Sequence, residues 1–148
     1  IMKGYWNNPE ATAEVIKDGW FRTGDIGKQD EFDFLIILDR AKDIVIRGGE
    51  NIGCAEVEYA ISEHPEVSEV SVYGIPDDRL GEIPCASLMI NRDSKLDTHQ
   101  LQTFLQSRIA AFKIPEMMFF QHEQFPRIAT GKIAKKELRL QTIELLGK

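Results

Sequence analysis

Lys132 follows a glycine in the segment Gly131-Lys132, a pairing that binds phosphate when it closes a P-loop. A P-loop also requires a glycine five residues before this pair and Ser or Thr directly after the lysine. This chain has Pro126 and Ile133 at those positions, so the P-loop interpretation is excluded. Lys132 remains a cation on a loop whose glycine gives it backbone freedom.

A second glycine segment, residues 47–51, lies between a short apolar run and a predicted helix. Its Gly48-Gly49 pair does not make a dinucleotide-binding fingerprint, because no third glycine opens the following helix at the required spacing. A tight turn is the simplest interpretation of the two glycines.

The cysteines and histidines are too scattered to indicate a metal site. Cys54 and Cys85 have no CxxC spacing, and His64, His99 and His122 stand apart from one another. We therefore expect no metal ligands, no disulfide framework, and reduced thiols buried as small apolar side chains in a cytoplasmic setting.

Composition and charge exclude other classes of protein. With 148 residues, 43% of them hydrophobic, the chain can bury one sizeable core. The net charge of −6 argues against general nucleic-acid binding, which requires a basic surface. The longest apolar run, residues 34–38, is too short to span a bilayer, and no signal peptide or lipidation motif is visible.

The first third of the chain is predicted to hold one short helix and the start of a strand pair. Asn8 is a suitable N-cap and Pro9 a suitable first residue for a helix over residues 9–16. Apolar runs at residues 32–38 and 44–46 predict two strands around the polar connector at residues 39–43. This connector is the expected domain boundary.

Beyond the connector, strands alternate with helices. The patterns predict helices over residues 55–64, 97–111 and 133–146, and strands over residues 67–75, 85–90 and 117–121. We expect an α+β fold in which helices flank a small three-stranded sheet.

Three motifs in a fixed order carry a resemblance to a known family. They are WFRTGD at residues 20–25, DRAKD with GGENI at residues 39–43 and 48–52, and FPRIATGKI at residues 125–133. The chain resembles, from end to end, the C-terminal third of the superfamily of acyl-CoA synthetases, peptide-synthetase adenylation domains and beetle luciferases. The resemblance implies that residues 1–41 are the short tail of a large N-terminal adenylating domain and residues 42–148 a mobile C-terminal lid domain. The chain also opens mid-sequence, so we expect a fragment that is inactive alone.

The resemblance assigns roles to three residues before and within the connector. Asp25 corresponds to the aspartate that hydrogen-bonds the ribose hydroxyls of ATP, and Arg40 to the arginine that assists at the same nucleotide. Lys42 falls at the hinge about which the C-terminal domain rotates between adenylate and thioester formation. The plain alternatives are a turn residue for Asp25, a surface salt bridge for Arg40 and a solvated lysine for Lys42.

Lys132 is implied to be the catalytic lysine. Attack of a carboxylate on the α-phosphate of ATP builds up negative charge, and a cation delivered there stabilises it by about 100- to 1,000-fold in rate. Gly48 and Gly49 match the loop that lines the pantetheine tunnel, with a tight turn as the alternative. A basic set could contact the phosphates of coenzyme A, although a solvated helix face is an alternative for most of it; the set is Lys113, Lys135, Lys136 and Arg139.

The resemblance therefore predicts the C-terminal domain of an AMP-forming carboxylic acid–CoA ligase that acts on a fatty or aryl acid. Its co-substrates would be ATP, Mg²⁺ and coenzyme A, and its partner the missing N-terminal domain of the same chain. Two alternatives stay open. One is an aryl-acid or amino-acid adenylating enzyme that loads a carrier protein, and the other is a non-catalytic binding relative.

Overall fold

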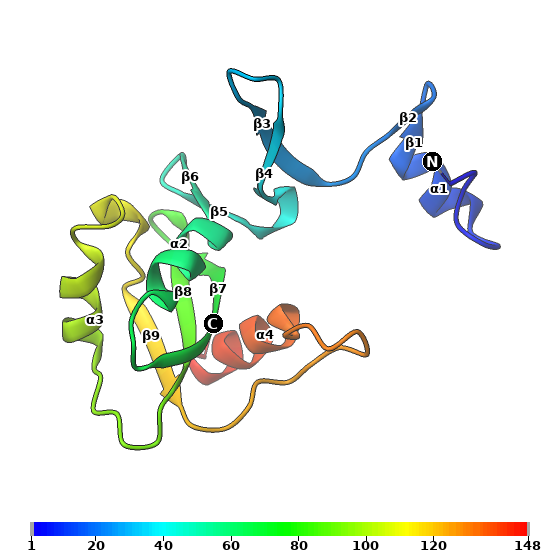
Figure 1. Cartoon of the computed structure of the whole chain (residues 1–148). Helices are drawn as coiled ribbons and strands as arrows, with labels where there is room; N and C mark the ends of the chain where they lie inside the picture. Colours follow the sequence, from blue (N-terminus) through cyan, green and yellow to red (C-terminus); the bar gives the residue numbers. More distant parts are fainter. Residues whose placement is uncertain (1, 148) are drawn as a thin grey trace. The chain divides into compact units, whose positions relative to one another are not determined.

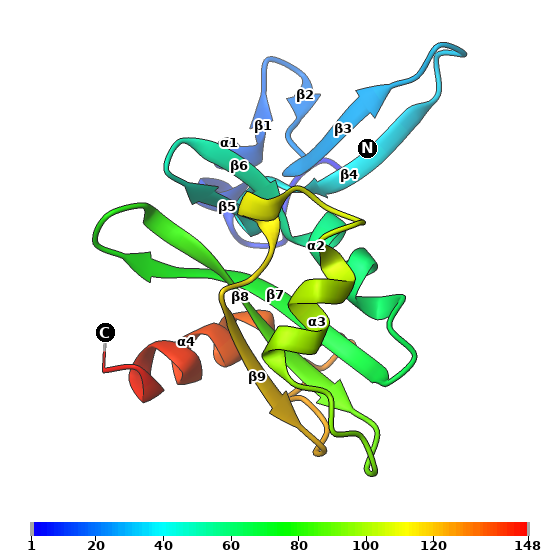
Figure 2. The ribbon, with the colours of Figure 1, turned by 90° about the vertical axis from the view of Figure 1, so that its left-hand side faces the viewer.

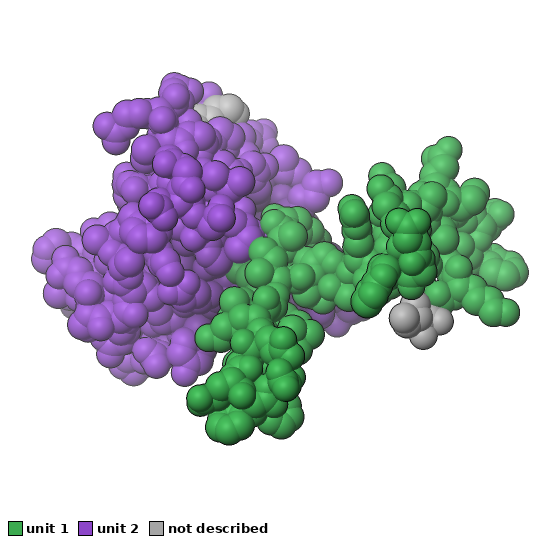
Figure 3. All heavy atoms as spheres, turned by 90° about the horizontal axis from the view of Figure 1, so that it is seen from above, with its two compact units in different colours: residues 1–42 green, residues 43–148 purple. Residues whose placement is uncertain are grey.

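The computed structural model describes residues 2–147, which divide into two compact units (Figure 3). Unit 1 ends at Lys42 and unit 2 begins at Asp43. The division falls one residue beyond the boundary expected from the polar connector.

Unit 1 consists of one helix and two hairpins. The helix α1 (Pro9–Val15) begins as predicted, because the Asn8 side chain accepts a hydrogen bond of 3.0 Å from the backbone N–H of Ala11. The hairpins are β1 (Ile16–Lys17) with β2 (Trp20–Phe21), and β3 (Asp25–Gln29) with β4 (Leu35–Arg40), as labelled in Figure 1.

The two hairpins correct the expectation for this region, which predicted only one strand, starting at residue 32. Asp18 and Gly19 both have positive φ, as the tight two-residue turn between β1 and β2 requires. In the second hairpin, the Asp30 carboxylate accepts hydrogen bonds of 2.9 Å from the N–H groups of Phe32 and Phe34. These bonds hold the segment in a turn, so β4 begins three residues later than predicted.

Unit 2 is built on a sheet of five strands. The predicted strands are present as β7 (Val67–Asp77), β8 (Gly81–Ile90) and β9 (Met117–Gln121); β7 pairs antiparallel and β9 parallel with β8. A hairpin of β5 (Ile44–Arg47) and β6 (Glu50–Gly53) extends the sheet beyond the three expected strands. It joins β8 through a single register pair, Arg47 with Gly81.

Three α-helices cover the sheet, together with the 3₁₀ turns η1 (Ala41–Asp43) and η2 (Ala111–Lys113). They are α2 (Cys54–Ser62), α3 (Thr98–Leu105) and α4 (Lys135–Leu145). Helix α3 begins with a capping box between Asp97 and Gln100, as helices with this spacing do. It stops well short of the predicted residue 111, because the chain breaks into turns closed by bonds such as Lys113 N–H to Ala110 O before returning as β9.

The two faces of the sheet bury separate cores, because successive residues of a strand point to opposite faces. On one face, Val72 and Leu88 pack with α2 and α3. On the other, Tyr73 and Cys85 pack with Leu138 of α4. Figure 2 shows α3 in front of the strands of the sheet and α4 behind them. The α+β class with flanking helices is therefore confirmed. Within residues 2–147, no helix is long and apolar enough to cross a membrane.

Candidate functional site

Asp25 and Arg40, the two predicted nucleotide ligands, are neighbours in unit 1. They face each other across β3 and β4, and the Arg40 Nε donates to Asp25 Oδ1 at 2.9 Å. A second guanidinium nitrogen of Arg40 donates to the Thr23 carbonyl at 3.3 Å, and the Thr23 hydroxyl accepts from the Asp25 N–H at 3.1 Å. The carboxylate and the guanidinium are both exposed, so one ligand could meet an acceptor and a forked donor at the same spot.

Lys42, the predicted hinge residue, lies in the 3₁₀ turn η1 between β4 and β5. Its side chain is exposed and makes no ion pair with any described residue. The Ala41 N–H donates to the Gly24 carbonyl at 2.8 Å, which closes the β3–β4 hairpin just before the turn. Lys42 is the last residue of unit 1, and its side chain forms no hydrogen bond or ion pair with the described residues 2–147.

Gly48 and Gly49 form the tight turn between β5 and β6. Their φ angles are +58° and +91°, and the flanking residues Arg47 and Glu50 pair directly, which favours glycine at both positions. The Gly48 N–H donates to the Leu80 carbonyl at 2.8 Å, and a Cβ on Gly48 would come within 3.2 Å of the Leu80 side chain. No atom lies within 4 Å of a Cβ placed on Gly49, so the backbone is open on that side.

Lys132 lies in a small hairpin loop that precedes α4. Arg127 and Ile133 form an isolated bridge, and the Ile128 N–H donates to the Lys132 carbonyl at 2.9 Å. Gly131 completes the loop with φ of +83°. Ile133 is in the extended conformation of this bridge, so it cannot be helical. The helix that was predicted from residue 133 therefore begins two residues later, at Lys135. The Lys132 side chain is exposed and makes no ion pair within residues 2–147.

The loop is attached to the sheet by a residue that the sequence did not single out. Arg127 donates to the Gly131 carbonyl at 2.9 Å and forms an ion pair with Glu69 of β7. These partners are 58 residues apart in the chain, so no local pattern predicts their contact.

Lys113 and Lys135, two of the cations expected to contact coenzyme A, are each paired with a carboxylate of unit 2. Lys113 Nζ lies 2.7 Å from both carboxylate oxygens of Glu56, and Lys135 Nζ lies 2.8 Å from Glu58. Burial by itself would lower the pKa of Lys135, but the Glu58 carboxylate outweighs it and the pKa is raised. A phosphate would have to compete with these carboxylates.

The other two cations of the set differ from each other. Arg139 donates to the Gly74 carbonyl at 2.7 Å and lies 3.6 Å from Glu82, so it holds α4 against β7 and β8. Lys136 is exposed, and no ion pair involving it is formed in the described part of the chain. Of the four, Lys136 is therefore the cation most available to a ligand.

The buried polar groups beneath α4 bond to one another and connect the helix to the sheet. The Tyr73 hydroxyl lies 2.6 Å from the Ser87 hydroxyl and 2.7 Å from that of Thr142, which ties α4 to the sheet. Burial raises the pKa of Tyr73 and raises that of the neighbouring Cys85 to about 12. Both groups stay protonated at neutral pH. The Cys54 side chain is also buried, as predicted for a small apolar side chain.

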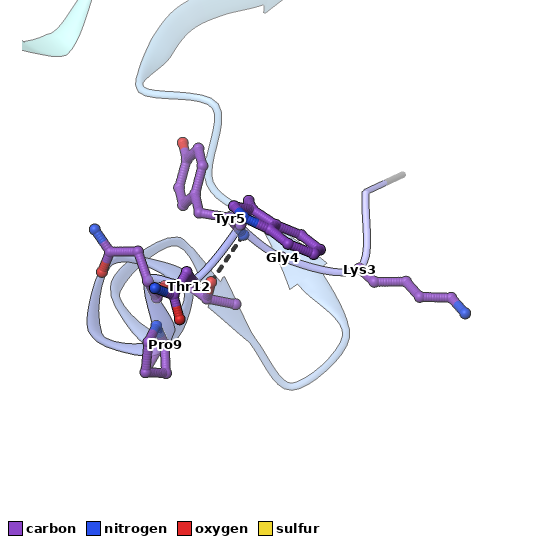
Figure 4. A pocket seen from close by; sticks show the side chains of 9 residues that line it. Lys3, Gly4, Tyr5, Pro9 and Thr12 are labelled. Carbon is purple, nitrogen blue, oxygen red and sulfur yellow. Dashed lines mark hydrogen bonds between the residues drawn. The ribbon is translucent and has the colours of Figure 1, made fainter.

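Unit 1 also contains an open hollow, shown in Figure 4. It is lined by residues 3–9, 12 and 13, and one wall is closed by a hydrogen bond of 2.9 Å from the Tyr5 N–H to the Thr12 hydroxyl. Its lining holds a single titratable cation, Lys3, and no acid beside it, so it offers no acid–base pair. No group of three or more His, Cys, Asp or Glu that could hold a metal gathers among residues 2–147.

Residues 56–132 match the family model described as the AMP-binding enzyme C-terminal domain. The chain is 46% identical to a long-chain-fatty-acid–CoA ligase of Bacillus subtilis over 93% of its length. Among solved structures, it matches o-succinylbenzoate CoA synthetase from Bacillus subtilis with a TM-score of 0.87 at 37% identity over 94% of the chain. It also matches the amide bond synthetase McbA from Marinactinospora thermotolerans, with a TM-score of 0.85 at 34% identity over 95%.

The matches cover only part of these longer proteins. The chain spans 24% of the fatty-acid ligase and 28% of each of the two solved chains. What the larger part of such a protein does is therefore outside the residues described here.

Proposed function

The chain belongs to the family of AMP-binding enzyme C-terminal domains, and from this premise we propose that it is the mobile lid of an ATP-dependent carboxylic acid–CoA ligase. The observation that carries the proposal is Lys132: an exposed, unpaired ammonium on a glycine loop that is anchored to a compact unit. The 46% identity to a fatty-acid–CoA ligase supports the same reaction class.

The proposed reaction has two steps. In the first, a carboxylate oxygen of the acid attacks the α-phosphorus of ATP, pyrophosphate leaves, and an acyl-adenylate forms. Lys132 meets the negative charge that builds on the transferring group and stabilises it as it develops. In the second, the thiol of coenzyme A loses its proton to solvent and its sulfur attacks the acyl carbon, so that the thioester bond forms, the bond from the acyl carbon to the phosphate oxygen breaks and AMP leaves.

The other site residues take supporting roles. The Asp25 carboxylate accepts hydrogen bonds from the ribose hydroxyls of ATP, and the Arg40 guanidinium beside it donates to the same nucleotide. Lys42 is the hinge, since its turn joins the two units and its own side chain forms no ion pair with residues 2–147. Gly48 and Gly49 would line the path of the pantetheine arm, which would pass the open side of the backbone at Gly49.

No group of three or more His, Cys, Asp or Glu side chains gathers among residues 2–147, so we propose no Mg²⁺ site made by this chain alone. We propose that it enters with the phosphates of ATP, which it commonly accompanies. The partner of the chain would be a large N-terminal domain holding the adenine and acid pockets, which is consistent with its covering 24% of the fatty-acid ligase. We also propose a reducing, cytoplasmic compartment, in which Cys54 and Cys85 would stay thiols.

The first test separates the two half-reactions in the longer enzyme that carries this chain. We expect Lys132→Ala to slow acid-dependent exchange of pyrophosphate into ATP by about 100- to 1,000-fold, while thioester formation from a supplied acyl-adenylate is largely spared. Lys95→Ala removes another exposed lysine of unit 2, one outside the proposed site, and serves as the matched control. Equal damage to both half-reactions by Lys132→Ala would show that Lys132 is structural.

The second test addresses the hinge. Lys42→Pro restricts one backbone dihedral in the connecting turn, so it should leave adenylate formation intact and block thioester formation. Lys42→Ala, which keeps the backbone free, is the control. An unaffected second step in the proline variant would remove Lys42 from the hinge.

The third test identifies the acid and the acceptor. Fatty and aryl acids are offered with ATP and, in parallel, free coenzyme A, a pantetheinylated carrier protein or a simple amine. We expect thioester formation on free coenzyme A. Product only on the carrier would support the carrier-loading alternative, and an amide product would match the activity named for McbA. Absence of any adenylate with every acid would favour a non-catalytic relative.

A further inference from the structure

Arg127 links the loop that carries Lys132 to the central sheet. One guanidinium nitrogen donates to the Gly131 carbonyl at 2.9 Å, directly before the lysine, and another pairs with Glu69 on β7. The same residue forms the backbone bridge to Ile133, directly after the lysine. Arg127 therefore contacts the chain on both sides of Lys132.

The Glu69 carboxylate has Arg127 as its hydrogen-bond donor. One oxygen of Glu69 accepts from Arg127, while its other oxygen is buried and has no hydrogen-bond partner among the described residues. Glu69 also belongs to β7, which pairs along its length with β8 at the centre of the sheet. Removing Arg127 would leave the charge of this partly buried carboxylate without a positive partner. Such a loss is destabilising, so we expect the ion pair to persist in the folded protein.

The two cations of the loop, Arg127 and Lys132, differ in whether they have a carboxylate partner. Arg127 is neutralised by Glu69, whereas Lys132 has no carboxylate partner in residues 2–147. A ligand with negative charge would therefore meet one free ammonium at a defined place. A displacement of about 1 Å in such a group can cost on the order of 100-fold in rate.

We propose that Arg127 and Glu69 are positioning residues that hold the Gly131-Lys132 loop in the geometry needed for adenylate formation. The proposal rests on the role of Lys132 proposed above. Neither residue touches the substrate in this mechanism; both act through the lysine.

Arg108 provides a matched control. It pairs with Glu63 at 3.2 Å and donates to a backbone carbonyl, that of Phe104, at 2.7 Å. The side chains of Arg108 and Arg127 are both 36% exposed. Arg108 joins the ends of α2 and α3, on the side of the sheet opposite α4, and has no contact with the Lys132 loop.

The kinetic experiment uses the longer enzyme with the variants Arg127→Ala, Arg127→Lys, Glu69→Gln and Arg108→Ala. We expect Arg127→Ala to lower kcat of adenylate formation by about 10- to 100-fold with little change in KM for ATP, and to spare thioester formation from supplied adenylate. Arg127→Lys and Glu69→Gln should lose less, because each keeps part of the contact. Arg108→Ala should leave both steps unchanged.

A double variant separates positioning from general stabilisation. If Arg127 acts through Lys132, Arg127→Ala adds nothing to the defect of Lys132→Ala. A further loss in the double variant, or equal loss in both half-reactions, would overturn the proposal. Arg127→Ala could also weaken folding, and in that case Arg127→Lys and Glu69→Gln decide the question by the same comparison.

Amide hydrogen exchange gives a readout that does not depend on activity. In Arg127→Ala we expect faster exchange in residues 128–133, where the Ile128 and Gly131 N–H groups are bonded within the loop, and unchanged exchange in β7 and β8. Unchanged exchange in the loop would overturn the proposal. If Lys132→Ala has no kinetic effect while loop exchange responds to Arg127→Ala, the proposed function fails and the anchoring of the loop stands.

Discussion

The two units differ in how their secondary structure is stabilised. No residue of unit 1 is buried in the described part, residues 2–42, and its large apolar side chains are open to solvent, with Trp6 at 97% and Phe32 at 73% exposure. Unit 2 buries two cores, one on each face of its sheet. Unit 1 is therefore held by turns and backbone pairing, and unit 2 by apolar burial as well.

This difference separates the candidate site residues by the rigidity of their support. Asp25 and Arg40 lie on a two-stranded hairpin, a structure that is marginally stable in water without further packing. Lys132 lies on a loop attached to a strand of a packed sheet. We expect Asp25 and Arg40, the proposed nucleotide-binding residues, to need an additional apolar surface against β3 and β4 before their geometry becomes fixed.

The largest expected effect comes from separating the units. A chain of residues 43–148 should unfold cooperatively and show a dispersed NMR spectrum, because it retains both cores. Residues 1–42 alone should show the narrow dispersion of an unfolded peptide, because they bury no side chain. A cooperative transition in the short piece, or loss of folding in residues 43–148, would remove the contrast between the units.

A matched pair of substitutions tests the same contrast at single residues. Leu88 is fully buried in β8, whereas Leu35 in β4 is 70% exposed. In the 148-residue chain, Leu88→Ala should lower the free energy of unfolding by about 2–5 kcal/mol through loss of burial and creation of a cavity. Leu35→Ala should change it by less than about 0.5 kcal/mol. Urea unfolding measures both, and similar values would show that unit 1 has a core in solution.

A smaller effect, confined to unit 2, is expected at high pH. The pKa of Cys85 is raised from 9.0 to about 12 by burial, so its contribution to stability is complete below pH 9 and is lost as the pH rises toward 12. The raised pKa values of Tyr73 and Lys135 act in the same direction above about pH 10.

Between pH 9 and pH 10, ionisation of the Cys85 thiol in the unfolded chain should lower the free energy of unfolding by about 1 kcal/mol. Cys85→Ala should flatten this slope, whatever its effect at neutral pH. Urea titrations of both proteins across this range measure the difference. An equal slope in the two would show that the thiol is not held protonated by burial.

Local patterns predicted the elements that depend on local chemistry. Residues 117–121 form β9 as expected, and Asn8 and Asp97 cap the helices that follow them. The strand pair β1–β2 was missed, although Asp18-Gly19 is a typical two-residue turn and was the available signal. Its strands are only two residues long, too short to show an alternating pattern.

Contacts between distant segments could not be predicted in the same way. The sequence motifs identify Asp25 and Arg40 as candidate site residues, but they do not predict that the two side chains pair directly across the hairpin. The contact of Arg127 with Glu69 depends on a fold that places the loop before α4 beside β7. Lys113 and Lys135 read as free cations in the sequence, and only the structure pairs them with Glu56 and Glu58. The roles of all six candidate site residues stay predictions; these are Asp25, Arg40, Lys42, Gly48, Gly49 and Lys132.

The parallel pairing of β9 with β8 has a consequence for the order of folding. Strands β7 and β8 are joined by a tight turn and can associate early, whereas β9 reaches β8 only after residues 91–116 have closed a long loop. Pairings between distant segments are slow to form, so docking of β9 is expected to limit the folding rate of unit 2. The Lys132 loop follows β9 in the chain and bonds to β7. We therefore expect it to be among the last parts of the nascent protein to acquire native structure.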